Sequence, residues 1–535
     1  MKMSSLLSVS KYSSKKHGSQ YTYQKNIMGT SPTTDSQYTL SKNIFHFPGN
    51  LSALLDRSAE LYPNRNGIGI PGQLVTFSEY YNRMCRMAHG LQKSGLERND
   101  RVLFISHNSL NYAFISLAVF RIGAILIPAN PRMRHYELAH ILSDAQPKFI
   151  ICERSNVETL LKAYQIIHAS PSACFITIDK KVSSMIFIND LDFSQELTHY
   201  EIMASDDTAM IVYTAAMDGY PLGAELTHAS IFYNAVFFAE RAFKDNAQSE
   251  VVSSILPLFH CFGFTVGFLM PLAGGATCLL LNTSSGGSKI VSLLDSYQAT
   301  HIISVPAILL TIMKPLSERS DLCSQLKNIA TGGVKISMNL LKKYQDQLGL
   351  AINEGYGLTE ASPAVTWNQI ERPPKLGTVG YPLGCCQIKI VDDAGEELPP
   401  GHEGEILVKG LNLFTKYTNQ PEHTHNSFIN NWFKTGDLGY LDNENYLTLT
   451  GLKKDMINIF GLKVYPKEVE KILLYHPYIQ SVRIWGEWHQ KYGDIVAGEV
   501  SLKSGRIISE KDFRNWCIQN ISPYKVPRKI IINPS

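Results

Sequence analysis

The loop YTAAMDGYPLGAELTH is the first stretch of the chain whose residue types could do chemistry. Gly219, Pro221 and Gly223 keep the outline of a tight nucleotide-binding turn between a strand, DTAMIVYT, and a helix. Successive backbone N–H groups in such a turn form a concave anion site. The stretch contains no lysine that could meet a phosphate. We therefore predict an anion-binding turn that relies mainly on its backbone.

The stretch INEGYGLTEAS combines a glycine-rich turn with oxygen ligands. Gly355 and Gly357 flank Tyr356, so the backbone can approach a flat ligand closely. Thr359 and Glu360 follow, and a single carboxylate acting with substrate phosphates is a usual way to hold Mg²⁺. The alternative is a helix N-terminus with an acid in its first turn, which is favourable without any ligand.

Two further stretches carry candidate polar residues. WFKTGDLGYLD places Asp437 in a glycine-flanked turn, where a carboxylate can accept hydrogen bonds from both hydroxyls of a ribose. The alternative is that Asp437 only closes an Asx turn. In GLKKDMINIF, Lys453 and Lys454 follow Gly451, where a hinge before a small domain would lie. Alternatively, these two lysines lie on a solvated surface and have no role in a hinge.

The composition restricts the class of protein. A chain of 535 residues exceeds the size at which one core stops growing, so we expect at least two domains. Lys and Arg number 50 against 47 Asp and Glu, a net charge of +3 that does not indicate nucleic-acid binding. The nine cysteines include no C-x-x-C pair, which predicts free thiols in a reducing compartment. The longest apolar runs are broken by Arg121 or by Pro271 and glycines, so we expect no transmembrane segment and a cytoplasmic location.

Three regions follow from the pattern along the chain. Residues 1–40 are rich in Ser, Lys, Tyr and Thr, which predicts a disordered leader. Residues 41–450 alternate helical and strand patterns, typical of a largely parallel sheet covered by helices, and from about 376 they change to short glycine-punctuated strands that predict an antiparallel β subdomain. Residues 451–535 have a small α+β pattern.

Specific helices and strands can be expected within these regions. The helices are expected at 49–62, 76–96, 111–123, 134–145, 466–476 and 509–520, and the strands at 100–106, 124–130, 148–153, 387–393, 404–410, 446–451, 479–487 and 495–502.

The chain resembles the adenylate-forming superfamily of acyl-CoA synthetases, 4-coumarate-CoA ligases and luciferases. Motifs that occur in the family's order over residues 45–530 are NDRVLFISHNS, AILIPANPRMRHYEL, PLFHCFGF, SVPAILL, TGGVKIS, GYGLTEASP, LGTVGYPLG, GEILVKG, FKTGDLGYLD and YKVPRKI. The resemblance implies an α/β fold: a large N-terminal domain of helix-covered sheets with a small β-barrel-like subdomain, and a small, mobile α+β C-terminal domain. It also implies a ligase reaction with ATP, Mg²⁺ and coenzyme A. A carboxylate attacks the α-phosphorus of ATP to give acyl-AMP and pyrophosphate, and a thiol then displaces AMP.

The resemblance also implies roles for single residues. Gly332, Gly333, Gly355 and Tyr356 would border the adenine, Asp437 would hold the ribose, and His260 would lie near the acyl group and the phosphate. Thr359 and Glu360 would meet phosphate and Mg²⁺, and Lys454 would be the hinge residue. The remaining implied nucleotide-binding positions are Thr214, Gly219, Gly223, Glu354 and Gly357.

Departures from the family's pattern leave two main interpretations. The family's loop reads Y-T-S-G-T-T-G-x-P-K-G, whereas this chain has Leu222 in place of the lysine and Asp218 near the phosphates. Leu452 replaces a family arginine, and the family's later P-x-T-x-S-G-K segment has no counterpart before Ser535. In one interpretation the protein is an acyl-CoA synthetase whose loop uses backbone amides, Thr214 and a metal. In the other it is an impaired relative that binds a nucleotide, an acyl group or a partner protein without adenylation. A truncated gene product is a third possibility.

The substrate expected by analogy is a fatty acid, with an aryl acid as the competitor. Phe237, Phe238, Phe262 and Phe264 could line an acyl pocket, although aromatic residues at such spacings also fill ordinary cores. The acceptor thiol is expected to be coenzyme A, with the arm of an acyl carrier protein as the alternative.

Overall fold

The structure is a computed structural model. It describes residues 46–214, 219–243, 247–282, 286–368, 374–452, 456–459, 462–489 and 493–533. The predicted leader, residues 1–40, lies outside these ranges.

An eight-stranded sheet forms one half of the large domain. Its order is β19-β9-β8-β4-β3-β5-β6-β7, and the run from β8 to β7 is parallel. The strands are β3 (Arg101–Ile105), β4 (Ile125–Ala129), β5 (Phe149–Cys152), β6 (Cys174–Thr177), β7 (Ile186–Phe187), β8 (Thr208–Thr214), β9 (Leu222–Thr227) and β19 (Lys416–Tyr417). Strand β4 is buried at every residue, as expected for a parallel sheet covered on both faces.

A nine-stranded sheet forms the other half. Its order is β16-β15-β14-β13-β12-β10-β11-β1-β2; the strands from β14 to β1 are parallel, and antiparallel strands close both ends. The strands are β1 (Asn66–Ile70), β2 (Gln73–Thr76), β10 (Val251–Ser254), β11 (Thr277–Leu280), β12 (His301–Ser304), β13 (Asn328–Thr331), β14 (Ile352–Gly357), β15 (Ala364–Trp367) and β16 (Tyr381–Pro382).

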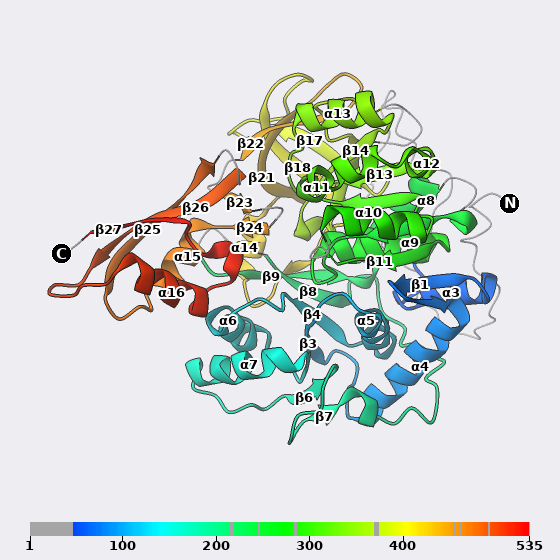
Figure 1. The fold of residues 1–535 in the computed structure, drawn as a ribbon, viewed down its shortest axis with the longest axis horizontal. Coiled ribbons are helices and arrows are strands. Elements are labelled where there is room, and N and C mark those ends of the chain that lie inside the picture. Colours follow the sequence, from blue (N-terminus) through cyan, green and yellow to red (C-terminus); the bar gives the residue numbers. More distant parts are fainter. Residues whose placement is uncertain are drawn as a thin grey trace.

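Helices lie in three layers around the two sheets (Figure 1). The layer between the sheets holds α3 (Ala53–Leu61), α4 (Phe77–Lys93), α5 (Leu110–Ile122), α8 (His228–Phe243), the π-helix η3 (Gly263–Leu269) and α9 (Met270–Gly274). The outer face of the eight-stranded sheet carries α6 (His135–Ala145) and α7 (Arg154–Ile166). The outer face of the nine-stranded sheet carries α10 (Gly287–Ser296), α11 (Pro306–Ser317), α12 (Ser320–Gln325) and α13 (Met338–Leu348). No helix in the described part of the chain is long and apolar enough to cross a membrane.

Local signals in the sequence set the helix ends. Helix α4 begins with a capping box, in which the Thr76 hydroxyl accepts from the Glu79 N–H and the Glu79 carboxylate accepts from the Thr76 N–H. Helix α5 ends at Gly123, whose φ of +77° is a left-handed conformation that glycine adopts at little cost. Outside the nucleotide-binding loop, the helices and strands expected at the ranges given above are present, with ends shifted by a few residues. The cysteines are free thiols, as predicted.

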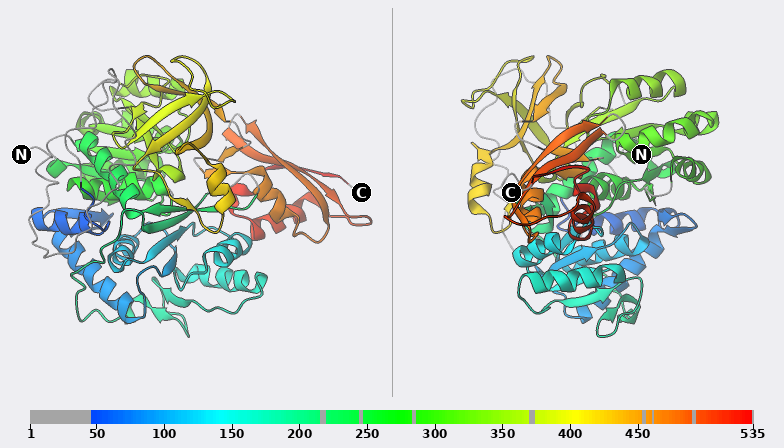
Figure 2. Two further views of the ribbon diagram at one scale, coloured as in Figure 1. Left: turned by 180° about the vertical axis from the view of Figure 1, so that it is seen from behind. Right: turned by 60° about the vertical axis from the view of Figure 1, so that its left-hand side comes forward.

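A five-stranded antiparallel sheet forms the predicted β subdomain, which lies at the top of the large domain in both views of Figure 2. Its elements are β17 (Cys386–Val391), β18 (Gly404–Gly410), α14 (Pro421–Asn426), β20 (Phe428–Ile429), β21 (Trp432–Leu441) and β22 (Leu447–Leu452).

The chain after the nucleotide-binding loop differs from the prediction. We expected a strand, the loop and then a helix. Instead the loop joins β8 to β9, which pair antiparallel, and α8 begins only at His228. The stretch after Pro221 is a strand because it pairs on both sides, with β8 and with β19. Strands β8 and β9 therefore form a β-hairpin.

The small domain is α+β. Its elements are β23 (Ile457–Ile459), β24 (Leu462–Val464), α15 (Pro466–Leu473), β25 (Ile479–His489), β26 (Gly493–Leu502), α16 (Glu510–Asn520) and β27 (Lys529–Asn533). Helices α15 and α16 pack on one face of the three-stranded sheet β25-β26-β27 around their own apolar core. Figure 1 shows this domain projecting from the α6 end of the large domain.

A buried ion-pair network joins the two domains. The Lys525 ammonium donates to the Glu137 carboxylate of α6 at 2.7 Å and also to Glu468 of α15. Burial alone would lower the pKa of Lys525, but the two carboxylates outweigh burial and raise this pKa well above its ordinary value. The Ser522 hydroxyl donates to Glu137 at 2.5 Å. One carboxylate of the large domain is therefore held by two residues of the small domain.

Lys525→Ala should destabilise the protein strongly, because it leaves two buried carboxylates without a cation. We expect the free energy of unfolding to fall by about 3 to 5 kcal/mol. Lys529→Ala is the matched control, since Lys529 pairs with Glu487 at the exposed surface and should cost less than about 1 kcal/mol. Urea denaturation of both variants measures the difference, and equal losses would contradict the buried network.

Candidate active site

An open cavity lies where β13 and β14 end. Its empty volume is about 640 Å³, open solvent included. The predicted site residues that line it are His260, Gly332, Gly333, Gly355, Tyr356, Gly357 and Thr359. Motifs far apart in the sequence therefore meet at the carboxyl edge of one sheet, where α/β proteins commonly bind ligands.

Tyr356 and Asp437 form a hydrogen bond at the edge of this cavity. The Tyr356 hydroxyl donates to Asp437 Oδ2 at 2.6 Å. Burial and the neighbouring Asp437 charge raise the pKa of Tyr356 well above its ordinary value, so the phenol keeps its proton. The bond joins the nine-stranded sheet to the five-stranded sheet. It also orients the carboxylate predicted to hold a ribose.

Asp437 lies in a bulged strand rather than in a simple turn. The pairing of β18 with β21 skips from Glu405 opposite Leu438 to Leu407 opposite Lys434, so residues 435–437 bulge. The backbone N–H of Asp437 donates to the Thr435 hydroxyl at 3.1 Å, so the Thr435 side chain caps this bulge. The Asp437 carboxylate itself accepts from Tyr356.

Glu360 is buried beside the cavity. It lies in a short 3-10 helix, Thr359–Ala361, and Tyr417 donates its hydroxyl to Glu360 Oε1 at 2.8 Å. Oxygen donors of this kind suit a hard cation such as Mg²⁺. Within the described ranges, no group of three or more His, Cys, Asp or Glu side chains could hold a metal ion. A metal at Glu360 would therefore need oxygen ligands from the substrate.

His260 and Cys261 of the PLFHCFGF motif also line the cavity. The His260 carbonyl accepts the Phe264 N–H at 2.9 Å, and this bond leads into the π-helix. Cys261 Sγ lies 3.7 Å from the Thr359 hydroxyl. His260 is therefore placed in the wall of the cavity next to the predicted phosphate residues.

Of the described loop residues, Thr214, Gly219 and Gly223 do not line this cavity. Thr214 ends β8, Gly223 lies in β9, and Gly219 has a φ of +80°. A Cβ on Gly219 would lie 2.7 Å from the carbonyl oxygen of Lys467 in α15, so the small domain packs directly against the loop. Residues 215–218 and Lys454 lie outside the described residues.

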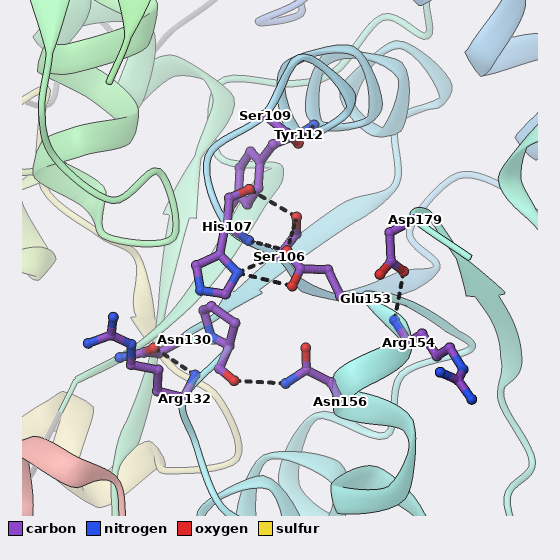
Figure 3. A network of polar contacts seen from close by, with 11 residues as sticks. Ser106, His107, Ser109, Tyr112, Asn130, Arg132, Glu153, Arg154, Asn156 and Asp179 are labelled. Atoms are coloured by element: carbon purple, nitrogen blue, oxygen red, sulfur yellow. Dashed lines mark hydrogen bonds and ion pairs between the residues drawn. The ribbon is translucent and has the colours of Figure 1, made fainter. Parts of the chain in front are cut away.

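A second polar network lies at the carboxyl edge of the eight-stranded sheet (Figure 3). The Ser106 hydroxyl and the His107 N–H donate to Glu153 Oε1 at 3.1 and 2.7 Å, which ties the end of β3 to the end of β5. In the next loop, the Arg132 N–H donates to Asn130 Oδ1 at 2.9 Å. The sequence analysis assigned no role to these residues, although they lie at the ends of predicted strands or within two residues after them.

This network supports the surface on which the small domain docks. The Ser522 hydroxyl lies 3.5 Å from the Arg132 carbonyl, close to the Glu137 contact. The Tyr136 and Tyr475 rings stack next to it, with centroids 4.5 Å apart. The loop after β4 therefore serves the domain interface.

Glu354 is a buried carboxyl within β14. Its Oε1 accepts the Ile336 N–H at 3.0 Å. Burial raises the pKa of Glu354 to about 7, and the Ile336 N–H and the Lys335 charge oppose this shift only in part. Below pH 7 the folded protein therefore holds a proton at this position.

Glu354→Gln should change how stability depends on pH. The pKa is about 7 in the folded protein and ordinarily 4.5, so the stabilisation by the protonated acid is complete below pH 4.5 and is lost as the pH rises to 7. The shift corresponds to roughly 3 kcal/mol. The neutral amide of glutamine does not titrate, so the variant does not lose stability in this way as the pH rises. The unfolding free energy of the variant relative to wild type should therefore rise by roughly 3 kcal/mol between pH 4.5 and pH 8, as measured by urea denaturation. Glu403→Gln, at an exposed position, is the control and should show no rise.

Comparison with known proteins agrees with this geometry. The family model described as AMP-binding enzyme matches residues 55–418, and the AMP-binding enzyme C-terminal domain matches residues 468–535. The feruloyl-CoA synthase of Amycolatopsis sp is 28% identical over 89% of this chain and 93% of its own. The long-chain-fatty-acid–CoA ligase of Bacillus subtilis (strain 168) is 28% identical over 89% of this chain and 90% of its own.

Solved structures of one enzyme match in two states. A double mutant of o-succinylbenzoate CoA synthetase (MenE) from Bacillus subtilis, bound with its product analogue OSB-NCoA, superposes with a TM-score of 0.78 at 28% identity, over 90% of this chain and 94% of that chain. The same enzyme in complex with the acyl-adenylate intermediate OSB-AMP gives 0.66 at 27% identity over the same shares. The cavity, the sheet topology and these matches lead to one conclusion: the chain belongs to the AMP-binding enzyme family.

Proposed function

We propose that this protein is an acid–thiol ligase that activates a carboxylic acid with ATP as an acyl-adenylate and passes the acyl group to coenzyme A. The observation that carries the proposal is that one cavity joins the glycines predicted to border adenine with an aromatic wall suited to an acyl group. The residues predicted for ribose and phosphate, Asp437 and Thr359, contact residues of that cavity or line it. Relatives named as CoA ligases support coenzyme A over a carrier-protein arm.

The geometry suggests how the first step would proceed. Asp437, fixed by Tyr356, would accept the ribose hydroxyls and so position the α-phosphorus. The substrate carboxylate would attack this phosphorus from the side of His260, and pyrophosphate would leave. Mg²⁺, when bound, would neutralise charge on the phosphate oxygens, with Thr359 and Glu360 as its protein oxygen donors. Catalysis would then depend on position and charge, as expected for transfer at phosphorus.

The domain arrangement supports the second step. The chain superposes better on MenE with its CoA product analogue than on MenE with acyl-adenylate, with TM-scores of 0.78 and 0.66. Equal coverage in the two comparisons points to domain orientation as the source of the difference. We infer that the small domain is docked as it would be when the thiol attacks the acyl carbon and AMP leaves. The Lys525 network would hold this orientation.

A second candidate function is binding of nucleotide and acid without adenylation. Leu222 favours it, because this residue of β9 stands where the family's loop has a lysine. Loss of one preorganised donor to a developing charge typically costs about 10² to 10³ in rate. In that case the cavity would bind nucleotide and acid, and no acyl-adenylate would form.

Acid-dependent pyrophosphate release by the full chain, with ATP, Mg²⁺ and coenzyme A, tests the proposal. A panel of fatty and aryl acids should contain substrates, and Asp437→Ala should lower kcat/KM for ATP by about 10² or more, since it removes the ribose acceptor. Asp442→Ala is the matched control, because Asp442 bonds a surface turn and the exposed Lys375 and does not line the cavity. No release with any acid, together with retained nucleotide binding, would favour the second candidate.

Glu360→Gln should weaken the affinity for ATP in the presence of Mg²⁺ by about tenfold, because it removes the proposed protein carboxylate from the metal. Tyr417→Phe removes only the hydrogen bond to Glu360 and should change this affinity less. Calorimetric titration with and without Mg²⁺ measures both. Unchanged affinity in Glu360→Gln would rule out the metal at this position.

A further inference from the structure

Asn108 forms a polar link between the two large sheets. It lies in the loop between β3 and α5, and its side chain pairs with the loop that follows β10. Its Nδ2 donates to the Leu256 carbonyl at 2.8 Å, and its Oδ1 accepts the Leu258 N–H at 2.8 Å. One side chain of the eight-stranded sheet therefore holds the backbone on both sides of Pro257.

The loop after β10 needs these two bonds. Leu256 and Leu258 are buried in a stretch that is neither helix nor strand. Buried backbone N–H and C=O groups require hydrogen-bond partners, and outside regular structure a side chain can supply them. Pro257 has no N–H and cannot take part. The Asn108 amide offers a donor and an acceptor side by side, so it satisfies both backbone groups at once.

The same loop leads directly into the cavity wall. The His260 N–H donates to the Pro257 carbonyl at 3.2 Å and so closes a turn over residues 257–260. A Cβ on Gly263 would clash with the Pro257 carbonyl oxygen, so this turn packs tightly against the start of the π-helix η3. His260 and Cys261 line the cavity. The position of the turn therefore sets the position of His260 in the wall.

Asn108 is itself held in place by its two neighbours in the sequence. On one side, the His107 N–H donates to Glu153 Oε1 at 2.7 Å, and His107 Nδ1 lies 3.0 Å from both carboxylate oxygens (Figure 3). On the other side, Ser109 is the N-cap of α5, and its hydroxyl accepts the Tyr112 N–H at 3.1 Å. The backbone at Asn108 is therefore fixed to the end of β5 and to the start of α5.

We propose that Asn108 is a positioning residue of the active site: it holds the turn 257–260 and, through this turn, places His260 where the acid and the α-phosphorus meet. The inference rests on the proposed function, since it names a residue that acts on that reaction. Asn108 does not line the cavity, so it acts only through the turn. A displacement of about 1 Å at a group that positions the reactants can cost about 10² in rate.

Asn108→Ala in the full chain tests this role. Pyrophosphate release is measured with ATP, Mg²⁺ and coenzyme A, and with octanoate, benzoate and cinnamate as the acids. For the acid that turns over best, kcat/KM should fall by about 10- to 100-fold, whereas KM for ATP should change less than about threefold, because the residues that border the nucleotide are untouched. Asn111→Ala is the matched control, since the Asn111 amide donates to the Ile178 carbonyl at 3.5 Å and does not bond the turn.

A double-mutant cycle with His260→Ala distinguishes positioning from a general loss of structure. In the His260→Ala background, Asn108→Ala should lower kcat/KM by less than about threefold further, because the group that was positioned is already gone. Losses that multiply would overturn the proposal, as would an Asn108→Ala variant as active as Asn111→Ala. If Asn108→Ala does not fold, Asn108→Asp takes its place in the cycle, since it keeps the shape and the acceptor for the Leu258 N–H and loses the donor.

Binding of unreactive acyl-sulfamoyl adenosines separates this inference from the proposed function, because these compounds need no turnover. Calorimetry with the octanoyl and benzoyl forms should give, for the form that binds more tightly, an affinity about tenfold lower in Asn108→Ala than in Asn111→Ala, while AMP binds both variants alike. If no acid releases pyrophosphate, the ligase function fails and this calorimetry decides: the tenfold difference supports the positioning role, and equal affinities overturn it. If pyrophosphate is released and Asn108→Ala is as active as Asn111→Ala, the positioning role fails and the ligase function stands.

Discussion

Burial of both faces of the two large sheets is the constraint on which the rest of the structure depends. Helices cover each outer face and fill the space between the sheets, so most strand side chains are apolar. The strands also carry buried polar side chains such as Asn328 and Glu354, but the polar groups that a ligand can reach are expected at the strand ends, where the chain leaves the core. Both polar regions of the large domain lie there: the cavity at β13 and β14, and the network at β3 and β5. The candidate active site is a consequence of this layering.

The same constraint explains how much of the fold could be predicted. Runs such as AILIPAN and KFIICE are continuous and short, which is the pattern of parallel strands covered on both faces, and the structure has β4 and β5 there. Strand β9 was missed because one of its two partner strands, β19, follows almost two hundred residues later in the chain. The residue pattern of β9 itself carries no information about a partner strand so far away in the sequence.

The site was predictable in its residues and less so in their contacts. The glycines, Tyr356 and Thr359 came from motif order, and the structure brings them to one cavity. The hydrogen bonds that orient the carboxylates come from elsewhere: Tyr356 reaches Asp437 across 81 residues, and Tyr417 reaches Glu360 across 57.

The charge missing from the loop is not restored by the small domain in this arrangement. Helix α15 places Lys467 and Lys471 against the loop, but Lys467 donates to Glu470 at 2.8 Å, and the Lys471 ammonium lies 3.5 Å from the centroid of the Tyr220 ring. Both cations are thus already engaged, and a phosphate near Leu222 would meet backbone N–H groups and a bound metal instead. A lysine in the loop would be present in every orientation of the small domain, whereas a cation on α15 is present only when that domain is docked. Under the proposed function, we infer that adenylation is the step in which this chain departs furthest from the family's loop pattern, and that its described domains are arranged for transfer to the thiol.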